Sequence, residues 1–162
     1  MAVLDYIIPG YKGYRQRTES RATDRAFRDY MAAKLKECHD QLEQLKMQIS
    51  MDISKMDLLT DAEQATALMT KVRDRLRWAN QGFAGTLMGS SEETEAIQAV
   101  ERFDQELENL RANVQQQMNQ LVSSVLGTDN PKPLFFQLMM SLRQMDNHLN
   151  ERENLIRKLL HS

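Results

Sequence analysis

The longest uninterrupted helical pattern in the chain dominates what it can fold into. Residues 18 to 58 contain neither proline nor glycine. Large apolar residues recur along and just beyond this run at spacings of three and four: Leu35, Cys38, Leu42, Leu45, Ile49, Met56 and Leu59. Upstream, Phe27, Tyr30 and Met31 extend the same face, and Asp52 interrupts it once. Heptad spacing of this kind predicts a long helix with one buried stripe, which needs partner helices to cover it.

Three further helices are indicated downstream. "TDAE" at residues 60 to 63 is a capping box that begins a second helix, whose stripe is Ala65, Leu68, Val72, Leu76, Ala79 and Phe83. The glycine-rich stretch 82 to 91 ends it, and a second capping box, Ser90 with Glu93, begins a third helix that runs to about Leu126. Its stripe is Val100, Phe103, Leu107, Leu110, Val114, Met118, Leu121 and Val125, with a stutter after Val114.

The fourth helix follows the linker "GTDNPKP" at residues 127 to 133. Its stripe is Phe135, Leu138, Leu142, Met145, Leu149, Ile156 and Leu159. Arg152 falls at an inward position of that stripe, so its guanidinium must pair with an acid or reach the surface.

These patterns predict an all-α fold without strands, an antiparallel bundle of about four helices with short connections. At about 1.5 Å per residue, the first helix spans about 60 Å and the second about 35 Å, so the first overhangs its neighbour. We divide the chain into a non-helical, aromatic and basic N-terminal arm, residues 1–17, and a helical bundle domain, residues 18–162.

The arm contains the least helical stretch of the sequence, "IIPGYKGYRQR" at residues 7 to 17. Pro9-Gly10 favours a type II turn, and Gly13 permits a second bend. Two bends hold Tyr11 and Tyr14 on a compact loop with Lys12 and Arg15 beside them, and tyrosine and arginine are frequent interface anchors. We expect this loop at one end of the bundle, near Phe27 and Tyr30, either as a lid over the core or as an element that docks a partner.

A second apolar surplus is "LFFQLMM" at residues 134 to 140, which is hydrophobic on more than one helix face. A bundle helix buries only one face, so this segment either thickens the core or contacts a partner. We take Phe136, Met139 and Met140 as candidate partner-binding residues, because methionine suits adaptable surfaces.

Enzymatic and metal-binding patterns are absent from the sequence. Neither of the Glu-x-x-His units of a di-iron bundle is present, and the adjacent Cys38 and His39 point about 100° apart on a helix. "GTLMGSS" lacks the Lys-Ser/Thr ending of a phosphate loop, and there is no Gly-x-Ser-x-Gly motif. We therefore expect a non-enzymatic protein with no catalytic, cofactor-binding or metal-binding residues.

Binding of nucleic acid or another polyanion is an alternative function. Basic residues recur at the beginning of the first predicted helix and at the end of the second, which would meet in an antiparallel hairpin: Arg17, Arg21, Arg25, Arg28, Arg73 and Arg77. Against this, Asp24 and Asp29 can pair with Arg28 and Arg25 at i, i+4 spacing, and the pI of the chain is about 5.9.

Peripheral membrane association through residues 1–17 is a second alternative, since Val3, Leu4, Tyr6, Ile7 and Ile8 precede basic residues; Asp5 and Pro9 count against it. With one cysteine, no recognisable secretion signal and no apolar run of about 18 residues, we expect a cytoplasmic protein.

The hypothesis that fits best is an interaction or scaffold protein. It self-associates, with a homodimer expected because twofold assemblies are commonest, and it docks a further protein through the arm and the surplus apolar surface.

Overall fold

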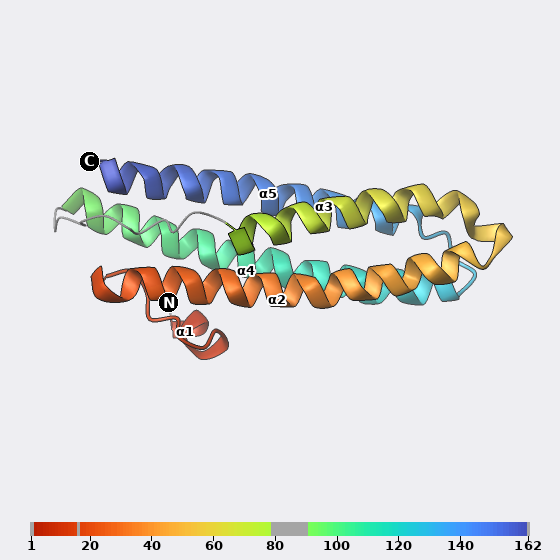
Figure 1. The fold of residues 1–162 in the computed structure, drawn as a ribbon, viewed down its shortest axis with the longest axis horizontal. Helices are drawn as coiled ribbons and strands as arrows, with labels where there is room; N and C mark the ends of the chain where they lie inside the picture. Colours follow the sequence, from red (N-terminus) through yellow and green to blue (C-terminus); the bar gives the residue numbers. More distant parts are fainter. Residues whose placement is uncertain (1, 16, 79–90, 162) are drawn as a thin grey trace.

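The long helices pack side by side into an elongated bundle (Figure 1). The computed structural model describes residues 2–15, 17–78 and 91–161. The helical elements, in chain order, are α1 (Ala2–Ile7), α2 (Arg17–Ser50), the 3-10 helix η1 (Ile53–Leu58), α3 (Leu59–Trp78), α4 (Ser91–Leu126) and α5 (Lys132–His161). These ranges contain no strand, so the prediction of an all-α bundle is confirmed.

The bundle has two distinct ends (Figure 1). At one end, which we call the tip, lie the α2–η1–α3 turn and the α4–α5 connection, so it comprises residues 47–59 and 124–140. The opposite end holds the beginnings of α2 and α4 and the end of α5. Around the bundle, α2 packs on α3 and α4, while α5 packs on α3 and α4, which places α2 and α5 on a diagonal.

The predicted stripes form the core of the bundle. In α2 the residues of the heptad run from Leu35 to Ile49 are fully buried, and Cys38 is one of them. In α4 the stripe stays buried across the predicted stutter, because Val114, Met118 and Leu121 all lie inside. Phe103 is only half-buried, with its ring 6.0 Å from that of His148.

The predicted first helix ends earlier than expected. After Ser50 the chain turns, and the side chain of Asp52 accepts a hydrogen bond from the amide of Ser54 (3.0 Å), which caps η1. Asp52 therefore ends the helix instead of occupying an inward position, and Met56 is 44% exposed rather than part of the stripe. The cause is local, since an aspartate side chain that bonds its own backbone competes with helix.

The predicted overhang of the first helix is present. With 34 residues in α2 and 20 in α3, the difference in length is about 20 Å at the helical rise. The first third of α2 thus extends beyond α3, and the arm packs against it (Figure 1).

The description of the arm as non-helical is wrong, because residues Ala2–Ile7 form α1. Leu4 and Ile8, one turn apart, are buried and explain why so short a helix forms against the bundle. Both predicted bends are confirmed. The amide of Tyr11 donates to the carbonyl of Ile8 (3.1 Å) across Pro9-Gly10, and Gly10 and Gly13 have φ of 85° and 82°, conformations that favour glycine.

Some predicted positions lie outside the described residues: Ala79, Phe83 and Ser90, together with the side chains of Arg17, Glu93 and Leu159. Within the described ranges, no helix combines the length and the apolar character needed to cross a membrane.

Candidate functional site

The two tyrosines of the arm insert into the bundle and share one acceptor. Tyr11 is 3% exposed and Tyr14 is completely buried. Both phenol hydroxyls donate to Oδ2 of Asp104 on α4, Tyr11 at 2.9 Å and Tyr14 in a shorter bond. The Tyr11 ring also packs edge-on against Tyr14 and Phe27, with centroids 5.8 and 6.4 Å away. The arm is therefore fastened by specific hydrogen bonds as well as by apolar contact.

Arg152 of α5 is the centre of this cluster. Its Nε donates to Oδ1 of Asp104 (2.6 Å), and its Nη2 donates to the hydroxyl of Tyr14 (2.9 Å) and to Oδ1 of Asp24 (2.7 Å). The guanidinium lies over the ring of Phe27, 5.0 Å from its centroid. The sequence predicted that Arg152 must pair with an acid or reach the surface. It pairs with Asp24 and Asp104 and is only 3% exposed.

A second arginine extends the cluster to α3. Arg28 donates from Nε to Oδ2 of Asp24 (3.0 Å) and from Nη1 to the carbonyl of Leu76 (3.2 Å). We call the six residues Tyr11, Tyr14, Asp24, Arg28, Asp104 and Arg152 the arm network. The arm network joins the arm, α2, α3, α4 and α5, and its two carboxylates balance its two guanidiniums.

Burial shifts the pKa of three members of the arm network, Asp104, Tyr11 and Tyr14. It raises the pKa of the Asp104 carboxyl above its ordinary value, although Arg152 beside it acts in the opposite direction. It raises the pKa of both phenols far above the usual value, and the Asp104 charge adds to the effect. All six groups are enclosed and hydrogen-bonded, so the arm network has the character of a fastening and presents no accessible nucleophile or base.

The candidate docking residues of the arm divide into two groups. Lys12 and Arg15 are exposed, whereas Tyr11 and Tyr14 face the core, so in this conformation the tyrosines cannot anchor a partner. Phe27 is completely buried; Tyr30 is half-buried, with its hydroxyl donating to Glu108 (3.1 Å). The expectation that the loop lies near Phe27 is confirmed. The loop could be a lid over the core or an element that docks a partner, and in this conformation it is a lid.

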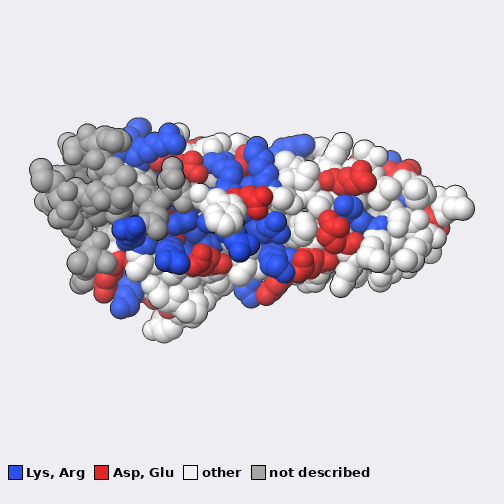
Figure 2. All heavy atoms as spheres, viewed as in Figure 1, with Lys and Arg blue, Asp and Glu red and all other residues white. Residues whose placement is uncertain are grey.

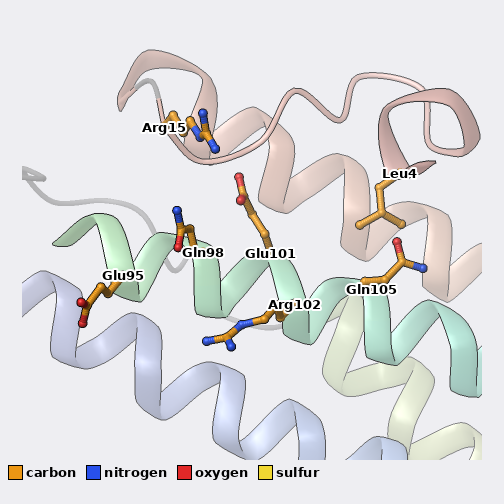
Figure 3. Close-up of a pocket in the computed structure, with 7 residues that line it drawn as sticks. All are labelled: Leu4, Arg15, Glu95, Gln98, Glu101, Arg102 and Gln105. Atoms are coloured by element: carbon orange, nitrogen blue, oxygen red, sulfur yellow. The ribbon is translucent and has the colours of Figure 1, made fainter. Parts of the chain in front are cut away.

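A cavity of about 550 Å³ lies beside the lid, between the arm and α4. Figure 3 shows Arg15 and Glu101 pointing toward each other across it, with Leu4 above Gln105, while Glu95 and Arg102 point away from the arm. Glu101 is 4% exposed and accepts a long hydrogen bond from the amide of Tyr14 (3.4 Å), and burial raises the pKa of its carboxyl. The mixture of two acids and two arginines gives this cavity no preference for one sign of charge.

Exposed apolar side chains gather mainly at the tip. Those more than 40% exposed there are Met47, Met51, Ile53, Met56, Leu126, Phe136 and Met140. The two halves of the tip are tied together, because Lys55 donates to the carbonyl of Val125 (2.5 Å) and Lys132 pairs with Asp57 (3.6 Å). Of the three predicted residues in "LFFQLMM", Phe136 (57% exposed) and Met140 (45%) lie on this surface, while Met139 is buried at 7%.

The arginines proposed for polyanion binding do not form one cluster. Arg28 belongs to the arm network, Arg25 pairs with Asp29 on the exposed surface (3.8 Å), and Arg73 pairs with Asp74 (3.5 Å). Arg21 and Arg77 are exposed. Both predicted i, i+4 pairs are therefore confirmed.

Metal and thiol chemistry find little support in the described part of the chain. There, no group of three or more His, Cys, Asp or Glu side chains is arranged to hold a metal ion. Cys38 is buried with its thiol donating to Gln115 (3.2 Å), which agrees with its predicted place in the core.

Sequence reasoning missed Asp24 and Asp104 as members of the arm network, although a signal was present. Asp104 lies between Val100 and Leu107 at heptad spacing, and Asp24 precedes Phe27 and Met31 on the same stripe. Charged residues at inward positions of a heptad stripe predict a buried network, and Arg152 is the third such residue.

No known protein family, curated protein or solved structure is similar to this chain. Functional inference therefore rests on the geometry of its own surfaces.

Proposed function

We propose that the protein is a non-enzymatic helical interaction protein that associates with a second copy of itself through the tip. The observation that carries this proposal is the gathering of seven exposed large apolar side chains at that end. A concentration of exposed large apolar side chains in one region of a protein is a mark of interaction sites. Four of the seven are methionines, whose flexible side chains adapt to an opposing surface.

The charge pattern of the tip also favours association. Figure 2 shows few charged atoms at the end of the bundle that carries the α2–η1–α3 turn. The charged residues of the tip are Asp52, Lys55, Asp57, Asp129 and Lys132. Four of them are already paired inside the chain, Lys55 with Asp52 (3.8 Å) and Lys132 with Asp57 (3.6 Å), so an interface would meet them as neutral pairs. A twofold dimer is the expected product, because two copies of one surface then cover each other.

The outer surface of the arm is the candidate site for a further protein. Val3 (53% exposed), Tyr6 (90%) and Ile7 (41%) point away from the bundle, on the side of α1 opposite Leu4 and Ile8. This refines the docking hypothesis, since the contact would involve α1 rather than Tyr11 and Tyr14.

Sedimentation equilibrium or light scattering across micromolar concentrations tests self-association. Ile53→Asp, at a side chain that is 92% exposed, should weaken the dimer about tenfold or more, because it buries an unpaired charge in the interface. Tyr6→Asp is the matched control, at a side chain that is 90% exposed on the arm, and should leave the dimer intact. A monomer at every concentration, or a dimer weakened by Tyr6→Asp and not by Ile53→Asp, would contradict the proposal.

A further inference from the structure

The only tryptophan of the chain lies at the surface, in basic surroundings. Trp78, the last residue of α3, is 74% exposed, and the guanidinium of Arg77 lies 5.3 Å from the centroid of its ring system. Figure 2, which looks onto α2 and α3, shows Lys and Arg atoms crowded over the middle of the molecule and toward the end opposite the tip. Leaving an indole in water forgoes a large burial free energy, so its exposure suggests a role in contact with a ligand.

Two neighbouring helices direct further arginines to this region. Arg28 of α2 contacts the carbonyl of Leu76, and Arg21 lies seven residues, or two helical turns, before Arg28 on the same side of α2. Arg75 of α3 contacts Asn150 of α5 (2.6 Å). Arg157 lies seven residues after Asn150, on the same side of α5. Since α3 ends at Trp78, Arg21 and Arg157 lie beyond its end, on either side of the extended helix axis.

The ionic state of these arginines distinguishes them from the rest of the basic surface. Lys71 and Arg75 are neutralised by Asp146, at 3.1 and 2.5 Å. In contrast, Arg21, Arg77 and Arg157 are exposed, and no ion pair within the described residues involves any of them. We call Arg21, Arg77, Trp78 and Arg157 the basic face. Among the described residues, nothing neutralises its guanidiniums, which suits them to an external anion.

We propose that the basic face binds single-stranded nucleic acid, with an unpaired base stacked on Trp78 and backbone phosphates on Arg21, Arg77 and Arg157. An exposed aromatic ring flanked by arginines is the combination that single-strand binders use, because every base has a face that can stack. Arg77 lies against the indole and holds a cation beside the stacked base. A duplex offers no unpaired base to the indole, so it fits this surface less well.

The net charge of −2 is distributed unevenly among the helices. Residues 91–106 of α4 contain six acids and one base, whereas residues 71–78 of α3 contain one acid and four bases. In Figure 1 the first part of α4 lies between α2 and α5, beyond the end of α3. The bases are therefore concentrated on α3, and phosphate would contact α3 rather than the first part of α4.

Intrinsic fluorescence provides a direct test, because the chain has a single tryptophan. Titration of the full-length protein with oligo(dT) and oligo(rU) of about 20 nucleotides in low salt should quench Trp78, and a labelled oligonucleotide should gain anisotropy in parallel. A matched duplex should bind at least about tenfold more weakly, since it loses the stacking contribution.

Variants assign the contacts to the basic face. Trp78→Ala, followed by anisotropy, should weaken binding about tenfold, and Arg21→Gln or Arg157→Gln should lower the slope of log affinity against log salt by about 0.7 each. Arg102→Gln is the matched control, because Arg102 is another exposed arginine but lies on α4. That variant should change neither quantity.

Two outcomes would overturn the proposal. One is the absence of quenching and of anisotropy change at tens of micromolar protein in low salt, or binding that Trp78→Ala and Arg21→Gln leave unaltered. The other is a blue shift of Trp78 fluorescence with vesicles rich in phosphatidylserine and no response to oligonucleotides, which would make this a membrane-contacting face. Neither result depends on the dimer, because the basic face and the tip lie apart along the bundle.

Discussion

Replacing Arg152 by methionine should cost more stability than replacing any other single arginine in the described part of the chain. Methionine keeps much of the side-chain volume and remains apolar, so the change removes the charge and the donors and little packing. What it leaves behind is Asp104 without its guanidinium and Asp24 with only Arg28, both within 2% exposure. A buried carboxylate that loses its cation keeps its desolvation cost, and no ion pair offsets that cost.

The size of the effect follows from the geometry. Arg152 is buried and donates three hydrogen bonds of 2.6 to 2.9 Å, two of them to carboxylates. Breaking a buried ion pair by removing one partner costs about 3–5 kcal/mol, out of a total stability of about 5–15 kcal/mol. For a domain of this size the midpoint of thermal unfolding should fall by about 10 °C.

Denaturant unfolding of the parent and of Arg152→Met measures this loss of free energy. Arg25→Met is the matched control, because its ion pair with Asp29 is exposed at 73% and 68% and should contribute less than about 1 kcal/mol. The reasoning is refuted if Arg152→Met loses less than about 1 kcal/mol, or if Arg25→Met loses as much. Combining Arg152→Met with Tyr14→Phe should give less than the sum of the two losses, since they share one site.

Three further predictions concern the arm and the core. Tyr11→Ala and Tyr14→Ala should each release the whole arm, seen as faster amide exchange at residues 3–15 with unchanged helix content in α2 to α5, whereas release of only the mutated turn would contradict cooperative docking. Because the pKa of both phenols is raised in the folded state, their contribution is complete below pH 10 and should decline above it by about 1.4 kcal/mol per pH unit and tyrosine; a Tyr11→Phe, Tyr14→Phe double variant followed by alkaline denaturation should lack this slope. Burial raises the pKa of Cys38 to about 11, so a thiol reagent at pH 8 should label it only after unfolding, and rapid labelling of the native protein would contradict its burial.

Periodicity predicted the architecture because each helix stripe is a local pattern. The positions of the long helices, the apolar residues of the core and the two bends at Gly10 and Gly13 follow from spacing and backbone preference alone. The end of α2 was misplaced because Asp52 acts through its own backbone, a contact that periodicity does not register. Similarly, α1 forms because Leu4 and Ile8 dock on the bundle, not because six residues favour helix by themselves.

The candidate sites could be predicted only in part, because they combine residues far apart in the chain. Sequence identified Tyr11 and Tyr14 and noted Arg152 as an inward charge, yet the bond from Arg152 to Tyr14 spans 138 positions. Which acid meets which base depends on how α4 and α5 align beside the arm, and apolar stripes leave alignments that differ by a heptad open. Of the basic face, the predicted series of arginines contained Arg21 and Arg77 but not Arg157. Sequence predicted the pairs of Arg25 with Asp29 and of Arg28 with Asp24, but not that of Arg73 with Asp74.

The arm network fixes the alignment of the helices along one another, which the apolar stripes alone do not fix. Leucine and methionine stripes tolerate sliding by a heptad, since one apolar contact replaces another. Asp104 and Arg152 do not tolerate it, because any other alignment of α4 with α5 would bury two charges without partners. The arm adds its two phenols to the same carboxylate, so it docks only when α2, α4 and α5 are already aligned. The arm network therefore selects one register of the bundle, and we expect Arg152→Met to release the arm as well, seen as faster amide exchange at residues 3–15.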